Sequence, residues 1–63
     1  MKYTFIFRFS VTHVETMTKT FYGSPEAFLF ARDEMNYLGA VNVRAYPDTT
    51  TECHKAFQIG GAF

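Results

Sequence analysis

The most reactive side chains in this 63-residue chain belong to one cysteine, Cys53, and two histidines, His13 and His54. Thiolate and imidazole groups bind zinc, but a structural zinc site takes four ligands in spaced pairs. Cys53 and His54 are adjacent, so on a strand they would point to opposite faces and would not share a metal ion. A lone cysteine is also a common filler of hydrophobic cores. We therefore expect no metal site and no cofactor.

Carboxylates and hydroxyls give no stronger sign of catalysis. Asp33 and Glu34 are adjacent, and on a helix they would diverge by about 100°, so they do not form a paired acid–base site. Ser10 and Ser24 have no catalytic motif around them, and a thin two-layer domain rarely forms a deep pocket. We therefore expect that the protein is not an enzyme.

The stretch Gly23–Gly39, GSPEAFLFARDEMNYLG, indicates one helix of about 14 residues, close to the usual length. Ser24 is a good N-cap, because its hydroxyl can accept a hydrogen bond from a free N–H of the first turn. Pro25 suits the first helical position, and Glu26 suits the positive end of the helix dipole. Gly39 can adopt the left-handed conformation that ends many helices.

This helix would present two different faces. At about 100° per residue, one stripe is apolar and is expected to pack on the core. The members of this stripe are Ala27, Phe28, Ala31, Met35 and Leu38. Phe30, Asp33 and Tyr37 fall away from it on one line. Either terminal strands or loops cover these side chains, or they form an exposed strip that contacts a partner.

Four segments have the composition of β-strands: residues 2–10, 14–22, 40–46 and 52–59. The first gives the strongest signal, because aromatic residues recur at every second position and would share one buried face. The second segment has an ambiguous facing, and we favour Met17 and Phe21 inward with a row of threonines outward. A bulge that changes the facing partway along is the alternative. Its charged residues favour an edge strand.

In the last two segments the inward-facing residues are expected to be Val41, Val43, Ala45, Cys53, Phe57 and Ile59. Gly60 and Gly61 would then release a tail in which only Phe63 could dock.

The element order strand-strand-helix-strand-strand predicts an α+β fold. A single helix would pack on one face of a three- to four-stranded antiparallel sheet. With the first strand in a central position, the expected spatial order is 2-1-3-4. The opposite face of the sheet would stay open. The residues expected on it are Thr4, Ile6, Arg8, Asn42, Arg44 and Tyr46.

Length and composition exclude several classes of function. The chain is short enough for one domain, and its six basic and six acidic residues cancel. Zero net charge argues against a membrane-surface protein and against a nucleic-acid binder that relies on neutralising phosphates. One cysteine allows no internal disulfide and fits a reducing cytoplasm. We expect no signal peptide, because Arg8 interrupts a short apolar run, and no stretch approaches the ~20 apolar residues that span a bilayer.

Two surfaces are candidates for binding a partner, since 12 aromatic residues exceed what one thin core needs. The first is Arg8, Arg44 and Tyr46 beside Ile6 on the open sheet face, because Arg and Tyr are enriched at binding hot spots. An ordinary solvated face is the alternative. If this surface bound nucleic acid instead of protein, bases would stack on Tyr46 and Tyr3. The second surface consists of Phe30, Asp33 and Tyr37.

The element order, the sequence FYGSPEAFLFA at the start of the helix and the ending VNVRAYP of the third strand carry a resemblance. Over roughly residues 2–47 the chain resembles the small podovirus inhibitors of host RNA polymerase. The resemblance implies that arginines on the last strand, just before a proline, bind the polymerase jaw. Arg44 matches one of them, Tyr46 stands at the second position, and Pro47 matches the proline. Several small anti-CRISPR proteins look similar in the same way.

We therefore expect a cytoplasmic phage-type protein that inhibits a host bacterial machine, RNA polymerase or a CRISPR-Cas defence complex, by stoichiometric binding. The first alternative is a structural homodimer in which the Phe30/Tyr37 strip or the edge strand pairs with its own copy. The second alternative is a small nucleic-acid-binding domain.

Overall fold

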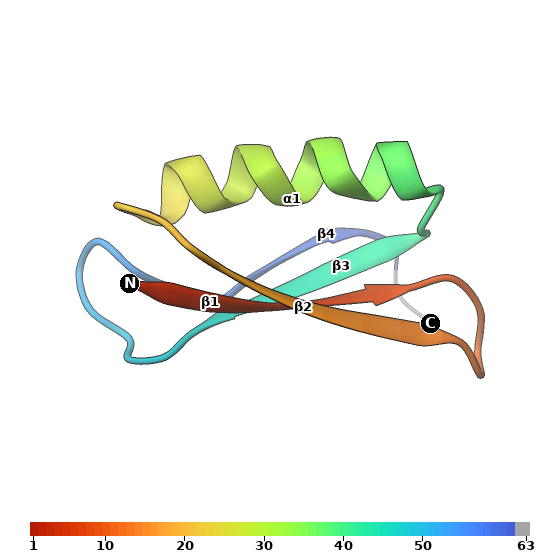
Figure 1. Cartoon of the computed structure of the whole chain (residues 1–63), viewed down its shortest axis with the longest axis horizontal. Helices are drawn as coiled ribbons and strands as arrows, with labels where there is room; N and C mark the ends of the chain where they lie inside the picture. The colour runs from red at the N-terminus through yellow and green to blue at the C-terminus, as the bar shows by residue number, and fades with distance from the viewer. Residues whose placement is uncertain (62–63) are drawn as a thin grey trace.

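The computed structural model describes residues 1–61 and places one α-helix across one face of a four-stranded antiparallel sheet (Figure 1). The elements are β1 (Lys2–Arg8), β2 (Val14–Thr20), α1 (Ser24–Leu38), β3 (Asn42–Pro47) and β4 (Phe57–Gly60). Across the sheet the strands lie in the order β2-β1-β3-β4. This confirms the predicted α+β class, the element order and the central position of the first strand. The predicted docking of Phe63 lies outside the described residues.

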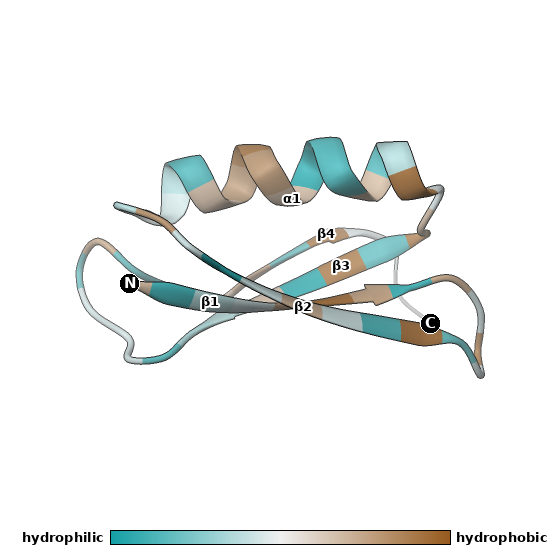
Figure 2. Ribbon diagram, in the orientation of Figure 1, coloured by the Kyte–Doolittle hydropathy of each residue, from teal (hydrophilic) through white to brown (hydrophobic). Residues whose placement is uncertain are grey.

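The core lies between α1 and the middle of the sheet. Tyr3, Phe5 and Phe7 of β1 are fully buried, and in the strand pairing Phe5 lies opposite Ala45 and Phe7 opposite Val43. Figure 2 shows hydrophobic residues alternating with hydrophilic ones along β3, and Val43 and Ala45 of this strand are buried. The helix contributes two small residues that are completely buried, and their size brings its backbone close to the sheet. They are Ala27 and Ala31.

The orientation of α1 differs from the predicted stripe at its flanks. Phe28 and Leu38 are 42% and 37% exposed, whereas Phe30, expected to point away from the core, packs against it. The alanines define the line of contact, so residues on both sides of that line reach the sheet. Phe28 rests on Phe57 with ring centroids 5.5 Å apart, and Phe30 lies 5.3 Å from Phe5. The prediction of Phe28 and Leu38 as core residues is therefore wrong in part.

The start of α1 also differs from the prediction, because Ser24 is not the N-cap. Gly23 occupies that position, and no side chain caps the helix. The Ser24 hydroxyl instead donates to the Cys53 carbonyl at 3.0 Å and accepts from the Lys55 N–H at 2.8 Å. Since its only hydrogen is used, the 2.8 Å contact with Tyr3 Oη is a bond that Tyr3 donates. Ser24 thus ties β1 and the β3–β4 loop to the helix.

The C-terminal end of α1 follows the prediction. Gly39 has φ 78°, in the left-handed region, and its N–H donates to the Met35 carbonyl at 3.0 Å.

Within residues 1–61, no helix has the length and apolar character needed to cross a membrane.

The fourth strand is shorter than predicted. Residues 52–56 belong instead to the loop between β3 and β4, in which Thr51 and His54 exchange backbone hydrogen bonds at 2.9 and 3.4 Å. Cys53 is exposed and not a core residue, because its carbonyl is held by Ser24 and its side chain is left outside. His54 turns inward and places its ring 5.9 Å from that of Tyr3. Both orientations reverse the prediction.

Gly60 allows the backbone of β4 to approach the start of β3 closely. Its φ is 94°, and a Cβ at this position would lie 2.5 Å from the Val41 carbonyl oxygen and 2.9 Å from Asn42 Cα. The close approach covers Asn42, which is only 3% exposed and donates from Nδ2 to the Gly61 carbonyl at 2.8 Å. The strand register keeps Asn42 on the predicted side of the sheet, but this backbone covers it. Val41 was predicted to be buried and is exposed, because β3 begins at Asn42, two residues later than predicted.

Candidate functional site

The strand register brings three predicted site residues to one side of the sheet. Arg44 lies opposite Ile6 of β1, and Tyr46 lies opposite Thr4. Arg8 is in register with the first residue of β3 and shares the parity of Ile6. Because side chains alternate along a strand, Arg8, Arg44 and Tyr46 all leave the sheet on the side opposite α1.

We call this side the open sheet face, because no helix or further strand within residues 1–61 packs on it (Figure 1). Only its edge at Asn42 is covered, by the backbone of Gly60 and Gly61. Its centre is Arg44, which is exposed, beside the half-buried Ile6. Tyr46 is 44% exposed. A row of exposed threonines lies along β2, and Gln58 lies opposite Arg44 on β4. The outward residues of the face are Lys2, Thr4, Ile6, Arg8, Val14, Thr16, Thr18, Thr20, Arg44, Tyr46 and Gln58.

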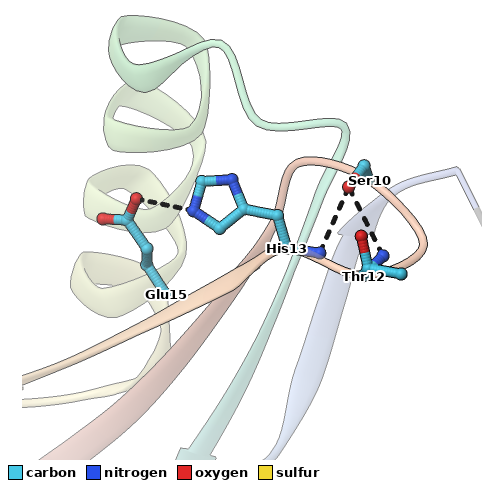
Figure 3. Close-up of polar contacts among 4 residues, drawn as sticks. All are labelled: Ser10, Thr12, His13 and Glu15. Atoms are coloured by element: carbon cyan, nitrogen blue, oxygen red, sulfur yellow. Dashed lines mark hydrogen bonds and ion pairs between the residues drawn. The ribbon is translucent and has the colours of Figure 1, made fainter.

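Arg8 has a structural role as well as a position on this face. Its Nη1 donates to the carbonyls of Ser10 and Val11 at 3.2 and 3.0 Å, in the loop between β1 and β2. The Ser10 hydroxyl oxygen accepts from the backbone N–H groups of Thr12 and His13 in the same loop (Figure 3). Arg8 therefore orders the hairpin loop, and the part of the face most available to a partner centres on Arg44 and Tyr46.

Charge is distributed unevenly over the fold, although its sum is zero. The open sheet face carries Lys2, Arg8 and Arg44, and no carboxylate among its described strand residues. On α1, three carboxylates accompany one cation; they are Glu26, Asp33 and Glu34, with Arg32. One side of the molecule is thus basic. Lys2 was missed as a member of this face, although its parity with Thr4 would have identified it.

The second predicted surface is not continuous. Phe30 is half-buried, packs against Phe5 and Phe21, and has Lys19 Nζ 4.6 Å from its ring centroid. Asp33 is exposed, and its Oδ1 accepts from Arg32 Nε and Nη2 at 3.2 and 3.1 Å. Tyr37 is 85% exposed. Of these three predicted side chains, Asp33 and Tyr37 therefore project into solvent and Phe30 does not.

The side chains with possible catalytic chemistry lie apart. His13 stacks on Phe9 in the hairpin loop, with ring centroids 4.8 Å apart, and its Nε2 is 3.1 Å from Glu15 Oε2 (Figure 3). His54 lies near Tyr3 at the other end of β1. The buried Nδ1 of His54 has no hydrogen-bond partner among the described residues. Over residues 1–61, no three His, Cys, Asp or Glu side chains are grouped to hold a metal ion.

A shallow pocket of about 490 Å³ lies where β2 leads into α1. Its lining contains neither Cys53 nor either histidine; it consists of Met1, Lys19, Thr20, Phe21, Tyr22 and Glu26. The pocket therefore brings together no nucleophile and base.

Comparison with known proteins assigns no class to the chain. No protein-family model, curated protein or solved structure gives a significant match. The function must therefore be argued from the surfaces themselves.

Proposed function

We propose that this protein binds one host bacterial protein machine through its open sheet face and inhibits it stoichiometrically. RNA polymerase is the first candidate partner. One observation carries the proposal: the register gathers Arg8, Arg44 and Tyr46 around Ile6 on a face that no helix or further strand of the described residues covers. Arginine and tyrosine around a central aliphatic residue have the composition of an interface hot spot.

The charge of this face indicates the chemistry of the partner. Lys2, Arg8 and Arg44 make it basic, so a complementary surface carries Asp and Glu side chains. A guanidinium such as that of Arg44 can bind a carboxylate through two parallel hydrogen bonds. Three cations would neutralise only about three phosphates, which gives weak binding to nucleic acid. An acidic protein surface is therefore the better fit.

The partner assignment is supported by the resemblance to the podovirus polymerase inhibitors. Arg44 and Pro47 occupy the positions that correspond to a polymerase-binding arginine and the proline after it. Both lie in β3, with Arg44 exposed near the centre of the sheet. Inhibition by binding alone requires no catalytic group, which is consistent with the dispersed positions of Cys53, His13 and His54. We place this activity in the bacterial cytoplasm.

The test uses purified bacterial RNA polymerase, with affinity measured by interferometry and promoter-directed RNA synthesis measured in parallel. The wild-type protein should bind and reduce RNA synthesis. Arg44→Glu should weaken binding at least about tenfold, because it reverses the charge at the centre of the face. The matched control is Arg32→Glu, which makes the same change on the exposed side of α1 and should bind like wild type.

Two results would contradict the proposal. If wild type binds polymerase and Arg44→Glu binds equally well, the open sheet face is not the contact surface. If wild type binds no polymerase, the partner assignment is wrong. Fluorescence anisotropy with a labelled single-stranded oligonucleotide completes the test, since tight binding there would favour the nucleic-acid alternative.

A further inference from the structure

The outer side of β2 is a regular and unpartnered strand edge. β2 lies at one end of the strand order, and no other described strand pairs with that side. Its pairing with β1 is continuous from Thr20 opposite Lys2 to Val14 opposite Arg8, with no bulge. Six of its seven residues are exposed, all but Met17. Such an edge presents a full row of backbone donors and acceptors to another strand.

The hydrogen bonds between β1 and β2 identify which residues present those groups. Beyond the end of the ladder, the Met1 amino group donates to the Phe21 carbonyl at 2.8 Å, and the Phe21 N–H donates to the Met1 carbonyl at 2.9 Å. At the other end, Phe9 donates to His13 at 2.9 Å. Hydrogen-bonded pairs recur at every second residue of an antiparallel ladder. Odd-numbered residues of β2 therefore bond to β1, and even-numbered residues direct their backbone groups outward.

The sequence of β2, VETMTKT, is complementary to itself about its centre. In an antiparallel pairing with Met17 opposite Met17 of a second copy, Glu15 faces Lys19 of that copy and Lys19 faces its Glu15. Opposite charges across a strand pair are stabilising. These charged pairs lie on the side of the sheet that α1 covers.

The same register also satisfies the backbone. Thr16 lies opposite Thr18 of the second copy, and Val14 lies opposite its Thr20. All four are even-numbered, so each of these pairs exchanges two backbone hydrogen bonds. Thr–Thr pairs are themselves favourable across strands. The helix lies over β1, β3 and β4, and so does not stand in the path of an incoming strand.

Other registers lose this match. A shift by one residue sets outward-facing groups against inward-facing ones and turns every side chain to the wrong face. A larger shift can set Glu15 against Glu15 or Lys19 against Lys19, and like charges directly opposite are destabilising. The centred register therefore combines full backbone pairing with charge complementarity.

We propose that two copies of this chain pair through β2 about a two-fold axis at Met17. The two four-stranded sheets would become one continuous sheet, with both helices on one side. Both open sheet faces would then lie together on the other side. A two-fold interface uses the same patch from each copy, as this one does. The net charge of zero adds no long-range repulsion between the copies.

The first experiment is sedimentation equilibrium over a range of concentrations. Wild type should reach twice the chain mass of 7.3 kDa. Thr18→Pro should stay monomeric, because it removes an outward N–H without removing a bond to β1. Thr18→Ala, which keeps that N–H, is the matched control and should dimerise. Circular dichroism checks that each variant is folded.

The second experiment tests the register by exchanging charges. Glu15→Lys alone and Lys19→Glu alone each create two like-charged pairs, and each should weaken self-association by about tenfold or more. An equimolar mixture of the two variants restores opposite charges at both pairs and should form a heterodimer. Wild type that stays monomeric up to about 1 mM, a Thr18→Pro variant that still dimerises, or a mixture that gains no mass would each overturn the proposal.

Discussion

Ser24 shows how one hydroxyl can connect segments that are distant in the chain. It lies at the first residue of α1, yet its bonds go to Tyr3, to the Cys53 carbonyl and to the Lys55 N–H. A hydroxyl has one hydrogen to donate and two lone pairs that accept, so this environment satisfies it completely. A serine before Pro25 is typical of an N-cap, and only the fold reveals the other role.

Ser24→Ala tests this connection. The substitution removes three hydrogen bonds and leaves the Tyr3 hydroxyl, on a fully buried residue, without its partner. An unpaired buried hydroxyl costs roughly 1–3 kcal/mol. We therefore expect a lower Tm, by about 4–8 °C for each kcal/mol in a domain of this size. Thermal denaturation followed by circular dichroism measures the change.

Tyr3→Phe supplies the control for that measurement. In the Ser24→Ala background it removes the hydroxyl that has lost its partner. The double variant should therefore lose less stability than the sum of the two single variants. Equal Tm values for wild type and Ser24→Ala would show that the Ser24 bonds contribute nothing.

At the scale of elements, the strands were easier to predict than the loops. Alternation at period two identified the buried face of β1, because each residue of a strand has only two directions to point. In β2 the alternation was ambiguous, and the favoured inward position of Met17 is confirmed. Residues 52–56 also carry strand-like residues, but long-range hydrogen bonds to Ser24 hold them as a loop. A local pattern contains no information about such bonds.

Gly60 gives a prediction about the pairing of β3 with β4. Gly60→Ala would place a methyl group against the Val41 carbonyl and would hold an L residue at φ 94°. A residue forced into such a conformation costs of the order of 1–3 kcal/mol, and the overlap adds to this. We expect a clear fall in the urea midpoint of unfolding. Gly61→Ala is the matched control, because nothing lies within 4 Å of its Cβ position, and it should unfold like wild type.

At the scale of the whole molecule, the candidate surface was predictable in part. From the sequence alone, strand parity predicted that Arg8, Arg44 and Tyr46 share one face, and the strand register confirms it. The hydrogen bonds from Arg8 to its own hairpin loop could not be predicted, because they depend on the path of that loop. Net charge was a poor guide, since equal numbers of acids and bases can still be sorted onto different sides of a fold.

This sorting predicts a dependence on salt. If the open sheet face binds an acidic partner, raising the ionic strength should weaken binding, chiefly through slower association, because salt screens exposed charges. The measurement is an interferometry series at increasing sodium chloride. Arg44→Ala should show a shallower dependence than wild type, whereas Arg32→Ala should keep the wild-type slope. Binding that is insensitive to salt would indicate an apolar contact.

The contacts of Ser24 also affect the order in which the protein matures during synthesis. The first hairpin and the helix emerge from the ribosome before residues 53–55, which hold the beginning of α1. Until those residues arrive, the Ser24 hydroxyl has only its bond with Tyr3 and lacks its two partners in the β3–β4 loop. Contacts so distant in sequence form late. A nascent chain that stops after β3 would therefore contain the two central strands, β1 and β3, but not the loop residues that hydrogen-bond to Ser24 at the start of the helix.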